Sequence, residues 1–70
     1  MQVEIYQISE KMPKLGTFEM VVIPRVREHL SFPVEDGRVA AIVVAVRHTF
    51  GAGQEVALFV TVESRSGGEA

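Results

Sequence analysis

The sequence predicts an all-β domain, folded as a small antiparallel barrel of four or five strands or as a strongly curled sheet. Val, Ile and Thr total 19 of the 70 residues, against 9 for Leu and Ala, and β-branched side chains favour extended strands. Short apolar segments are separated by glycine and proline, and no stretch has a convincing helical period. We expect one domain over residues 1–63.

The small size of the chain makes its core marginal. A domain of 70 residues buries only roughly 60% of the surface that its unfolded chain exposes. There is no cysteine, which excludes disulfides and thiolate metal sites as additional stabilisation. Self-association is the remaining supplement, so we expect a homodimer.

Charge and hydropathy disfavour two classes of partner. The net charge is −2, whereas proteins that bind nucleic acid normally carry a basic surplus. No apolar run approaches the roughly 20 residues that a membrane helix needs. The start of the chain, Met1-Gln2-Val3-Glu4, lacks the basic region of a signal peptide. We therefore expect a cytoplasmic protein that acts outside the membrane.

The first two strands are predicted over residues 1–8 and 17–24. In the first strand, the apolar side chains change face at Tyr6, which indicates a bulge or a strong twist. Residues 9–16 contain proline and glycine and form the connection. Pro24 cannot donate a ladder hydrogen bond, so the second strand is expected to end there or to lie at an edge.

Residues 25–28 are compatible either with one helical turn or with an extended segment. The strand that follows alternates apolar and polar residues over 30–34, and Asp36-Gly37 is a strong hairpin signal because a type I′ turn needs positive φ at both central residues. A two-residue loop there pairs Val34 with Val39, Phe32 with Ala41 and Leu30 with Val43.

The last two strands, within residues 37–63, are the most apolar part of the chain. They are joined by a turn at Gly51-Ala52-Gly53-Gln54. A three-residue loop pairs His48 with Val56, whereas a four-residue loop shifts this register. Residues 64–70 have no apolar anchor, so we expect a disordered C-terminal tail.

The strand over residues 38–48 is apolar on both faces, which indicates that it is buried twice. One face has Ala40, Ile42, Val44 and Val46, and its bulk suits a barrel interior. The other face has smaller side chains that suit a close subunit contact. Alternatively, the N-terminal strand and residues 25–30 cover that face. The interface candidates are Val39, Ala41, Val43, Ala45 and Phe59.

Four basic residues are candidates for binding an anion or a nucleic acid. These are Arg25, Arg27, Arg47 and His48, because arginine offers a fork of donors that suits phosphate and carboxylate. The simpler alternative is that the arginines pair with glutamates on a solvated surface. Those glutamates are Glu19, Glu28 and Glu55.

No catalytic, metal or cofactor motif is found. His29 and His48 are the only histidines, and neither has a metal-ligand spacing with a carboxylate. Gly51-Ala52-Gly53 joins strand to strand and is too short for a phosphate-binding loop. No nucleophile elbow occurs. We therefore expect no enzyme activity and no cofactor.

The overall layout resembles that of small SH3-like barrel proteins of uncharacterised function carried by phages and mobile, integron-type gene cassettes. The resemblance covers residues 12–63 and lies in the succession of segments, without a diagnostic motif. It implies a partly open barrel of about five strands and no activity. The segments that carry it are Met12-Pro13-Lys14-Leu15-Gly16, Phe32-Pro33-Val34-Glu35-Asp36-Gly37-Arg38-Val39 and Val46-Arg47-His48.

The function expected from the sequence is that of a non-enzymatic interaction module, self-associating and able to add a strand from a partner protein to a sheet edge. One alternative is a small barrel that binds nucleic acid through Arg25, Arg27 and Arg47. A second alternative is a small-molecule-binding or hydrolytic domain with a pocket at a dimer interface.

Overall fold

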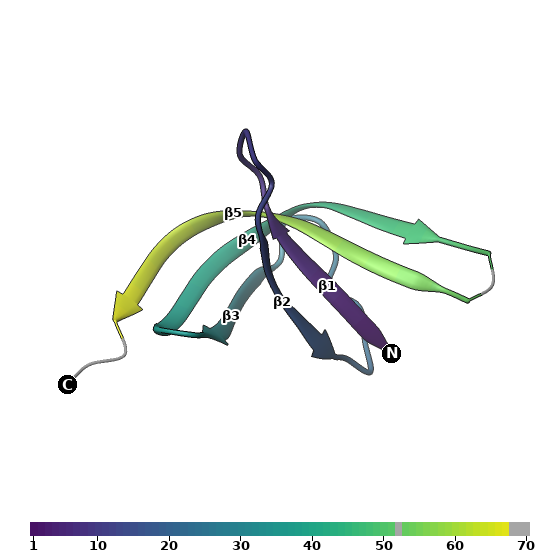
Figure 1. Cartoon of the computed structure of the whole chain (residues 1–70), viewed down its shortest axis with the longest axis horizontal. Helices are drawn as coiled ribbons and strands as arrows, with labels where there is room; N and C mark the ends of the chain where they lie inside the picture. Colours follow the sequence, from purple (N-terminus) through teal and green to yellow (C-terminus); the bar gives the residue numbers. More distant parts are fainter. Residues whose placement is uncertain (52, 68–70) are drawn as a thin grey trace.

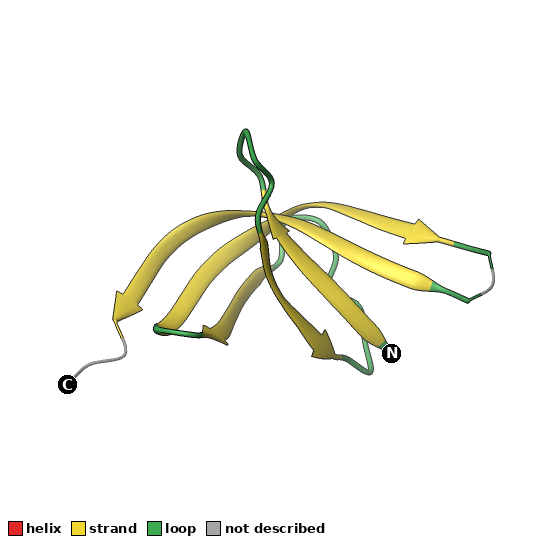
Figure 2. Cartoon of the chain, viewed as in Figure 1, coloured by secondary structure: helices red, strands yellow, loops and turns green. Residues whose placement is uncertain are grey.

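The chain folds as one five-stranded sheet (Figure 1). The computed structural model describes residues 1–51 and 53–67. The strands are β1 (Gln2–Gln7), β2 (Lys14–Glu19), β3 (His29–Val34), β4 (Gly37–Thr49) and β5 (Glu55–Gly67). Figure 2 shows strands and loops alone, so the predicted all-β class is confirmed and no helix in these two ranges could cross a membrane.

The strand order is β2-β1-β5-β4-β3, and the sheet is mixed. β1 pairs with β5 in parallel, while the other neighbours are antiparallel. The expectation of a purely antiparallel sheet is therefore wrong, because the first and last strands lie side by side in the middle. The sheet bends strongly, but β2 and β3 stay as edge strands (Figure 1). The result is a curled, open sheet.

The β1–β2 register shifts between Ile5 and Tyr6, but the extra residue is Leu15 of β2, and β1 pairs with β5 without a break. The predicted change of face at Tyr6 is therefore wrong: Val3 and Ile5 are buried, while Tyr6 lies on the opposite face of β1. The second strand covers Lys14–Glu19 rather than residues 17–24, since its last partner on β1 is Gln2. Beyond that point the chain leaves the sheet, and the side chains of Met20 and Ile23 pack against the core.

The hairpin between β3 and β4 turns one residue earlier than predicted. Val34 pairs with Gly37, so the loop is Glu35-Asp36. Gly37 has a φ of 152°, which glycine adopts readily, and neither loop residue has the positive φ of a type I′ turn. Strand partners therefore shift by two residues, so Leu30 and Phe32 still share one face of the sheet with Val39 and Ala41.

Residues 25–28 form a β-turn that docks on β4, instead of a helical turn or a strand. Glu28 N donates to Arg25 O at 3.0 Å, and Arg27 N donates to Val43 O at 2.8 Å. Arg27 has a φ of 80°. The turn therefore extends the β3–β4 ladder by one step and ends it at Val43.

The long β4–β5 hairpin adopts the register of a three-residue loop. His48 pairs with Val56, and Val46 pairs with Leu58; Ala52 in that loop lies outside the described residues. β5 continues through Ser64 to Gly67, opposite the start of β4. The predicted disorder is wrong for these four residues, because backbone pairing holds them without an apolar anchor. Residues 68–70 of the predicted tail lie outside the described ranges.

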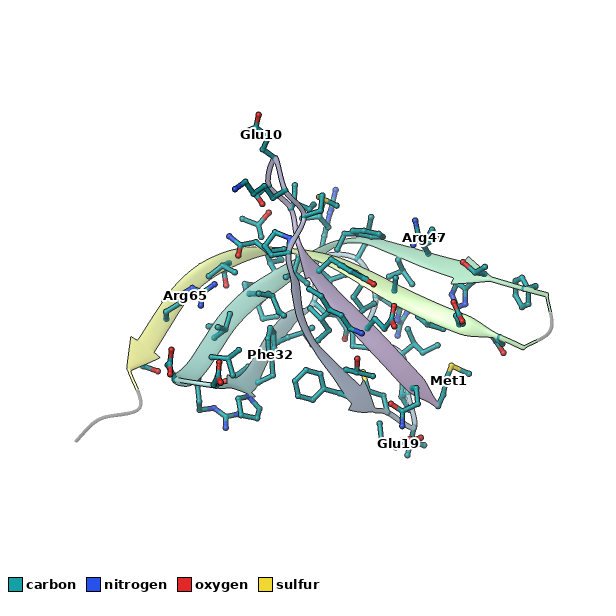
Figure 3. The ribbon with its side chains drawn as sticks, in the orientation of Figure 1. Met1, Glu10, Glu19, Phe32, Arg47 and Arg65 are labelled. Atoms are coloured by element: carbon teal, nitrogen blue, oxygen red, sulfur yellow. The ribbon has the colours of Figure 1, made fainter. Side chains whose placement is uncertain are left out.

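The core lies on one face of the curled sheet, which we call the inner face. It unites side chains from β1, β3, β4 and β5, and Figure 3 shows Phe32 beneath the bent strands. Leu58, in the first half of β5, is completely buried. The buried cluster is Val3, Ile5, Phe32, Val39, Ala41, Val43, Val56, Leu58 and Val60.

Up to Val43, the two faces of β4 are assigned in the opposite way from the sequence prediction, whereas Val46 packs on the core as predicted. Val39, Ala41 and Val43, predicted at a subunit interface, are at most 1% exposed and belong to the core. The register with β5 shifts between Val43 and Ala45, and a bulge of this kind moves the following side chains to the other face. Val46 therefore packs on the core, while Val44 is 46% exposed.

Leu58→Ala should lower the free energy of unfolding by about 2–5 kcal/mol, because it leaves a cavity in a packed core. Val21→Ala is the matched control, since Val21 is 99% exposed and the loss should stay within about 0.5 kcal/mol. Urea unfolding followed by circular dichroism measures both. Equal losses in the two variants would contradict this core.

Candidate functional site

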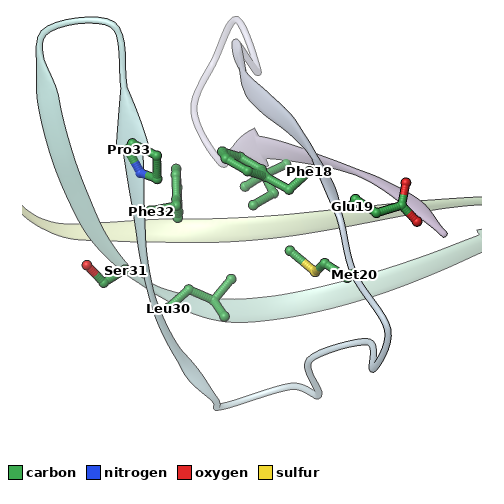
Figure 4. A pocket seen from close by; sticks show the side chains of 8 residues that line it. Phe18, Glu19, Met20, Leu30, Ser31, Phe32 and Pro33 are labelled. Carbon is green, nitrogen blue, oxygen red and sulfur yellow. The ribbon is translucent and has the colours of Figure 1, made fainter.

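An apolar cleft of about 250 Å³ lies between the edge strands β2 and β3 (Figure 4). The rings of Phe18 and Phe32 meet across it in an edge-to-face contact, with centroids 5.5 Å apart. Side-chain contacts therefore bring these two strands together, while the strand order leaves both as edges. The cleft is lined by Ile5, Phe18, Glu19, Met20, Leu30, Ser31, Phe32 and Pro33.

The edge of β2 offers peptide groups for pairing. Met20 N donates to Met1 O at 2.8 Å, so the peptide group of residue 20 is one of those that point toward β1. Alternate residues of an antiparallel strand bond to the same neighbour, so Thr17 and Glu19 direct their peptide groups away from β1. They face the seam between β2 and β3.

The edge of β3 is less available than that of β2. Val43 N donates to Glu28 O at 2.9 Å, and by the same alternation Ser31 and Pro33 face away from β4. Pro33 has no N–H to donate, and Arg38 Nη2 donates to Ser31 O at 3.3 Å. Proline and a capping basic side chain are ordinary devices for blocking an edge. The seam is thus open to pairing mainly along β2.

The four predicted basic residues lie along β4 rather than in one pocket. Arg25 and Arg27 belong to the turn beside Val43, while Arg47 and His48 follow on the strand; all four are exposed. Adjacent strand residues point to opposite faces, so the side chains of Arg47 and His48 diverge. His48 instead stacks on the exposed ring of Phe50, with centroids 6.3 Å apart.

The outer face carries a cluster that the sequence did not predict. The Tyr6 and Phe59 rings stack with centroids 5.7 Å apart, and the Arg47 guanidinium lies 5.2 Å from the Phe59 centroid. Figure 3 shows Arg47 on this side of the sheet. Phe59, predicted at a subunit interface, is half-buried by these neighbours within the chain, while Ala45 is exposed.

Hydrogen bonds in this cluster shift two pKa values. The Tyr6 hydroxyl donates to Glu4 Oε1 at 2.8 Å, and Lys14 Nζ donates to Glu4 Oε2 at 3.2 Å. The bond from Tyr6, and after it the one from Lys14, lowers the pKa of Glu4. The carboxylate in turn raises the pKa of Tyr6. The cluster therefore holds Glu4 ionised and Tyr6 neutral.

The two histidines have different neighbours. His29 Nδ1 lies 3.0 Å from Glu63 Oε1, whereas His48 stacks on Phe50. Across residues 1–51 and 53–67, no three His, Asp or Glu side chains gather as metal ligands. The two features that the structure forms in these ranges are the seam between β2 and β3 and the outer-face cluster around Phe59.

The cleft and the cluster were missed for a common reason. The alternation of Phe18 with Met20, and of Leu30 with Phe32, is visible in the sequence, but it indicates only that each strand has an apolar face. That the two strands face each other depends on the order β2-β1-β5-β4-β3. The parallel pairing of Tyr6 with Phe59 has no sequence signal either.

No known protein family matches this chain, and no curated protein or solved structure matches it.

Tyr6→Phe should raise the pKa of Glu4 toward its ordinary value of about 4.3, because it removes a hydroxyl donor and keeps the stacked ring. A carboxylate whose pKa is lower in the folded chain than in the unfolded chain stabilises the fold at pH values above its unfolded-state pKa. This contribution is lost as the pH falls through the folded-state pKa. When the pH is lowered from about 6 to about 3, the free energy of unfolding of the variant should therefore fall less than that of the wild type.

Carbon-13 NMR titration of Glu4 measures the pKa directly, and urea unfolding at several pH values measures the linked stability. Lys14→Met is the comparison variant, since it removes the second donor and should shift the Glu4 titration less. An unchanged Glu4 titration in Tyr6→Phe would show that the hydrogen bond is not formed in solution.

Proposed function

We propose that this protein is a non-enzymatic interaction module that binds an extended segment of a partner protein in the seam between β2 and β3. The apolar cleft of about 250 Å³ beside the edge of β2 carries this proposal. Strand addition uses main-chain hydrogen bonds for affinity and pockets for alternate side chains for specificity. The seam supplies both kinds of contact.

The two sides of the seam have different roles in this proposal. The peptide groups of Thr17 and Glu19 pair with the incoming segment, because β2 is the less obstructed edge. β3 contributes the apolar side chains of Leu30 and Phe32, which face the cleft across from β2. An apolar anchor of the partner then replaces water between the two strands, and burial of such anchors dominates binding in many interfaces.

A bound segment would also complete the barrel. In this proposal the free chain is a curled sheet, and the closed, SH3-like arrangement belongs to the complex. A sheet edge without a neighbour invites such pairing. The cytoplasmic location and the resemblance to SH3-like barrel proteins stay expectations from the sequence.

The homodimer also stays a proposal, but its surface must differ from the predicted one. Val39, Ala41 and Val43 are buried within the chain, so a second copy would contact other apolar side chains. Val21, Val22 and Phe50 are the most exposed of these, at 99%, 78% and 74%. Exposed apolar groups of this kind favour association.

A phage-displayed library of random linear heptapeptides should enrich sequences with apolar residues at alternate positions. Leu30→Lys should weaken an enriched peptide by about tenfold or more, because it places a charge in the apolar cleft. Ile8→Lys is the matched control, since Ile8 is 43% exposed and does not line the cleft. Fluorescence anisotropy measures the affinities.

Hydrogen exchange on the unchanged protein gives a second readout if Leu30→Lys does not fold. The amides of Thr17 and Glu19 should become protected when the peptide binds, because they face the seam. Peptides that bind Leu30→Lys and the wild type equally, or that leave both amides unprotected, would refute pairing at β2.

A further inference from the structure

We propose that the edge of β4 from Val44 to Thr49 is a second binding site, separate from the seam, and that it takes an acidic extended segment of a partner protein. β3 accompanies β4 only from Gly37 to Ile42. The Arg27 amide in the preceding turn donates to Val43 O, which extends the hydrogen bonding along this edge of β4 by one residue. Beyond that point β4 pairs with β5 alone.

This length of strand is exposed along its outer edge. The long hairpin runs out beyond the rest of the sheet in Figure 1, and β1 covers β5 from Val56 to Val60 on its other side. Every residue from Val44 to Thr49 is exposed except the partly buried Val46. A two-stranded hairpin with one edge lacking a neighbour is open to a third strand.

The charge beside this edge is predominantly positive. Arg25 and Arg27 lie in the turn where the β3 ladder ends, and Arg47 lies four residues beyond Val43, roughly 13 Å along an extended strand. In the part of the chain that the structure describes, the ion pairs use other residues. Carboxylates of an added strand would meet Arg25 and Arg27 beside Val43, because arginine binds carboxylate well. Arg47 adds positive charge on the outer face, where its guanidinium lies over the Phe59 ring of β5.

The nearest acidic groups cancel only part of this charge. Glu28 lies in the same turn, where its carboxylate accepts a hydrogen bond from Arg25 N, and it offsets one of the three arginines. Glu55 lies on β5 opposite Thr49, on the side of the hairpin away from the edge. Apolar side chains are also present, since Val26 is 50% and Val44 is 46% exposed. The site therefore suits a segment that carries both acidic and apolar residues.

Two other occupants fit this edge less well. A second copy of the chain, paired antiparallel about the middle of this edge, would place the two Arg47 residues close together, and like charges across paired strands are destabilising. A membrane is unsuited, because an open sheet edge cannot satisfy its peptide groups in hydrocarbon. An acidic segment of another protein meets both the charge and the hydrogen-bonding demand.

The test uses a fluorescent hexapeptide of alternating glutamate and valine, titrated into the full chain, with the matching lysine and valine peptide as control. The acidic peptide should bind more tightly, and higher ionic strength should weaken it. The triple variant Arg25→Glu, Arg27→Glu, Arg47→Glu should weaken binding by about tenfold or more. Arg65→Glu, an exposed charge change elsewhere on the sheet, should change it by less than about twofold.

Backbone methylation separates strand addition from simple charge attraction. Two versions of the acidic peptide carry N-methyl groups on alternate residues, in opposite phases. One version should lose about tenfold in affinity and the other little, because only alternate amides of an edge pair face the sheet. Equal binding of both versions and the unmodified peptide would overturn the proposal, as would equal binding of the lysine peptide.

A single-stranded oligothymidylate supplies the competing chemistry. If it binds more tightly than the acidic peptide and loses affinity in the triple variant, the edge is a nucleic-acid surface and the proposal is wrong. A peptide enriched on the seam should bind the triple variant and the wild type equally, so failure at this edge is distinguishable from failure at the seam.

Discussion

The parallel pairing of β1 with β5 is the contact on which the rest of the structure depends. It brings Val3 against Val56 and Ile5 against Leu58, and all four side chains are buried. An isolated two-stranded hairpin is at best marginal in water, so β1 and β2 need this neighbour to stay folded. The core is therefore assembled by joining the two ends of the described chain in the middle of one sheet.

This arrangement also decides where the sheet is left incomplete. With β1 and β5 in the centre, β2 and β3 become the edges, and the strong curl brings their apolar side chains into contact. Pro33 and the cap that Arg38 places on Ser31 O oppose backbone pairing from the β3 side. A seam results in which side chains touch while peptide groups of β2 stay available. The proposed interaction module follows from that incomplete closure.

The length of β4 creates a second incomplete edge with a different chemistry. β3 is shorter than β4, so the end of β4 extends past it, and the bulge after Val43 turns Arg47 onto the outer face. The seam is apolar and the β4 edge is basic. In the proposed function, one small sheet would distinguish two kinds of extended partner, because each edge pairs a similar backbone with different side chains.

The sequence by itself determined the all-β class and, as one of two alternatives, the three-residue register of the last hairpin. These features depend on side-chain alternation and turn residues, which act over a few positions. The parallel pairing of β1 with β5, the seam and the inward face of β4 were decided only by the tertiary structure. Val39, Ala41 and Val43 show why: both faces of β4 are apolar, so alternation could not say which one meets the core. The bulge at Val44 and strands distant in the sequence settled it.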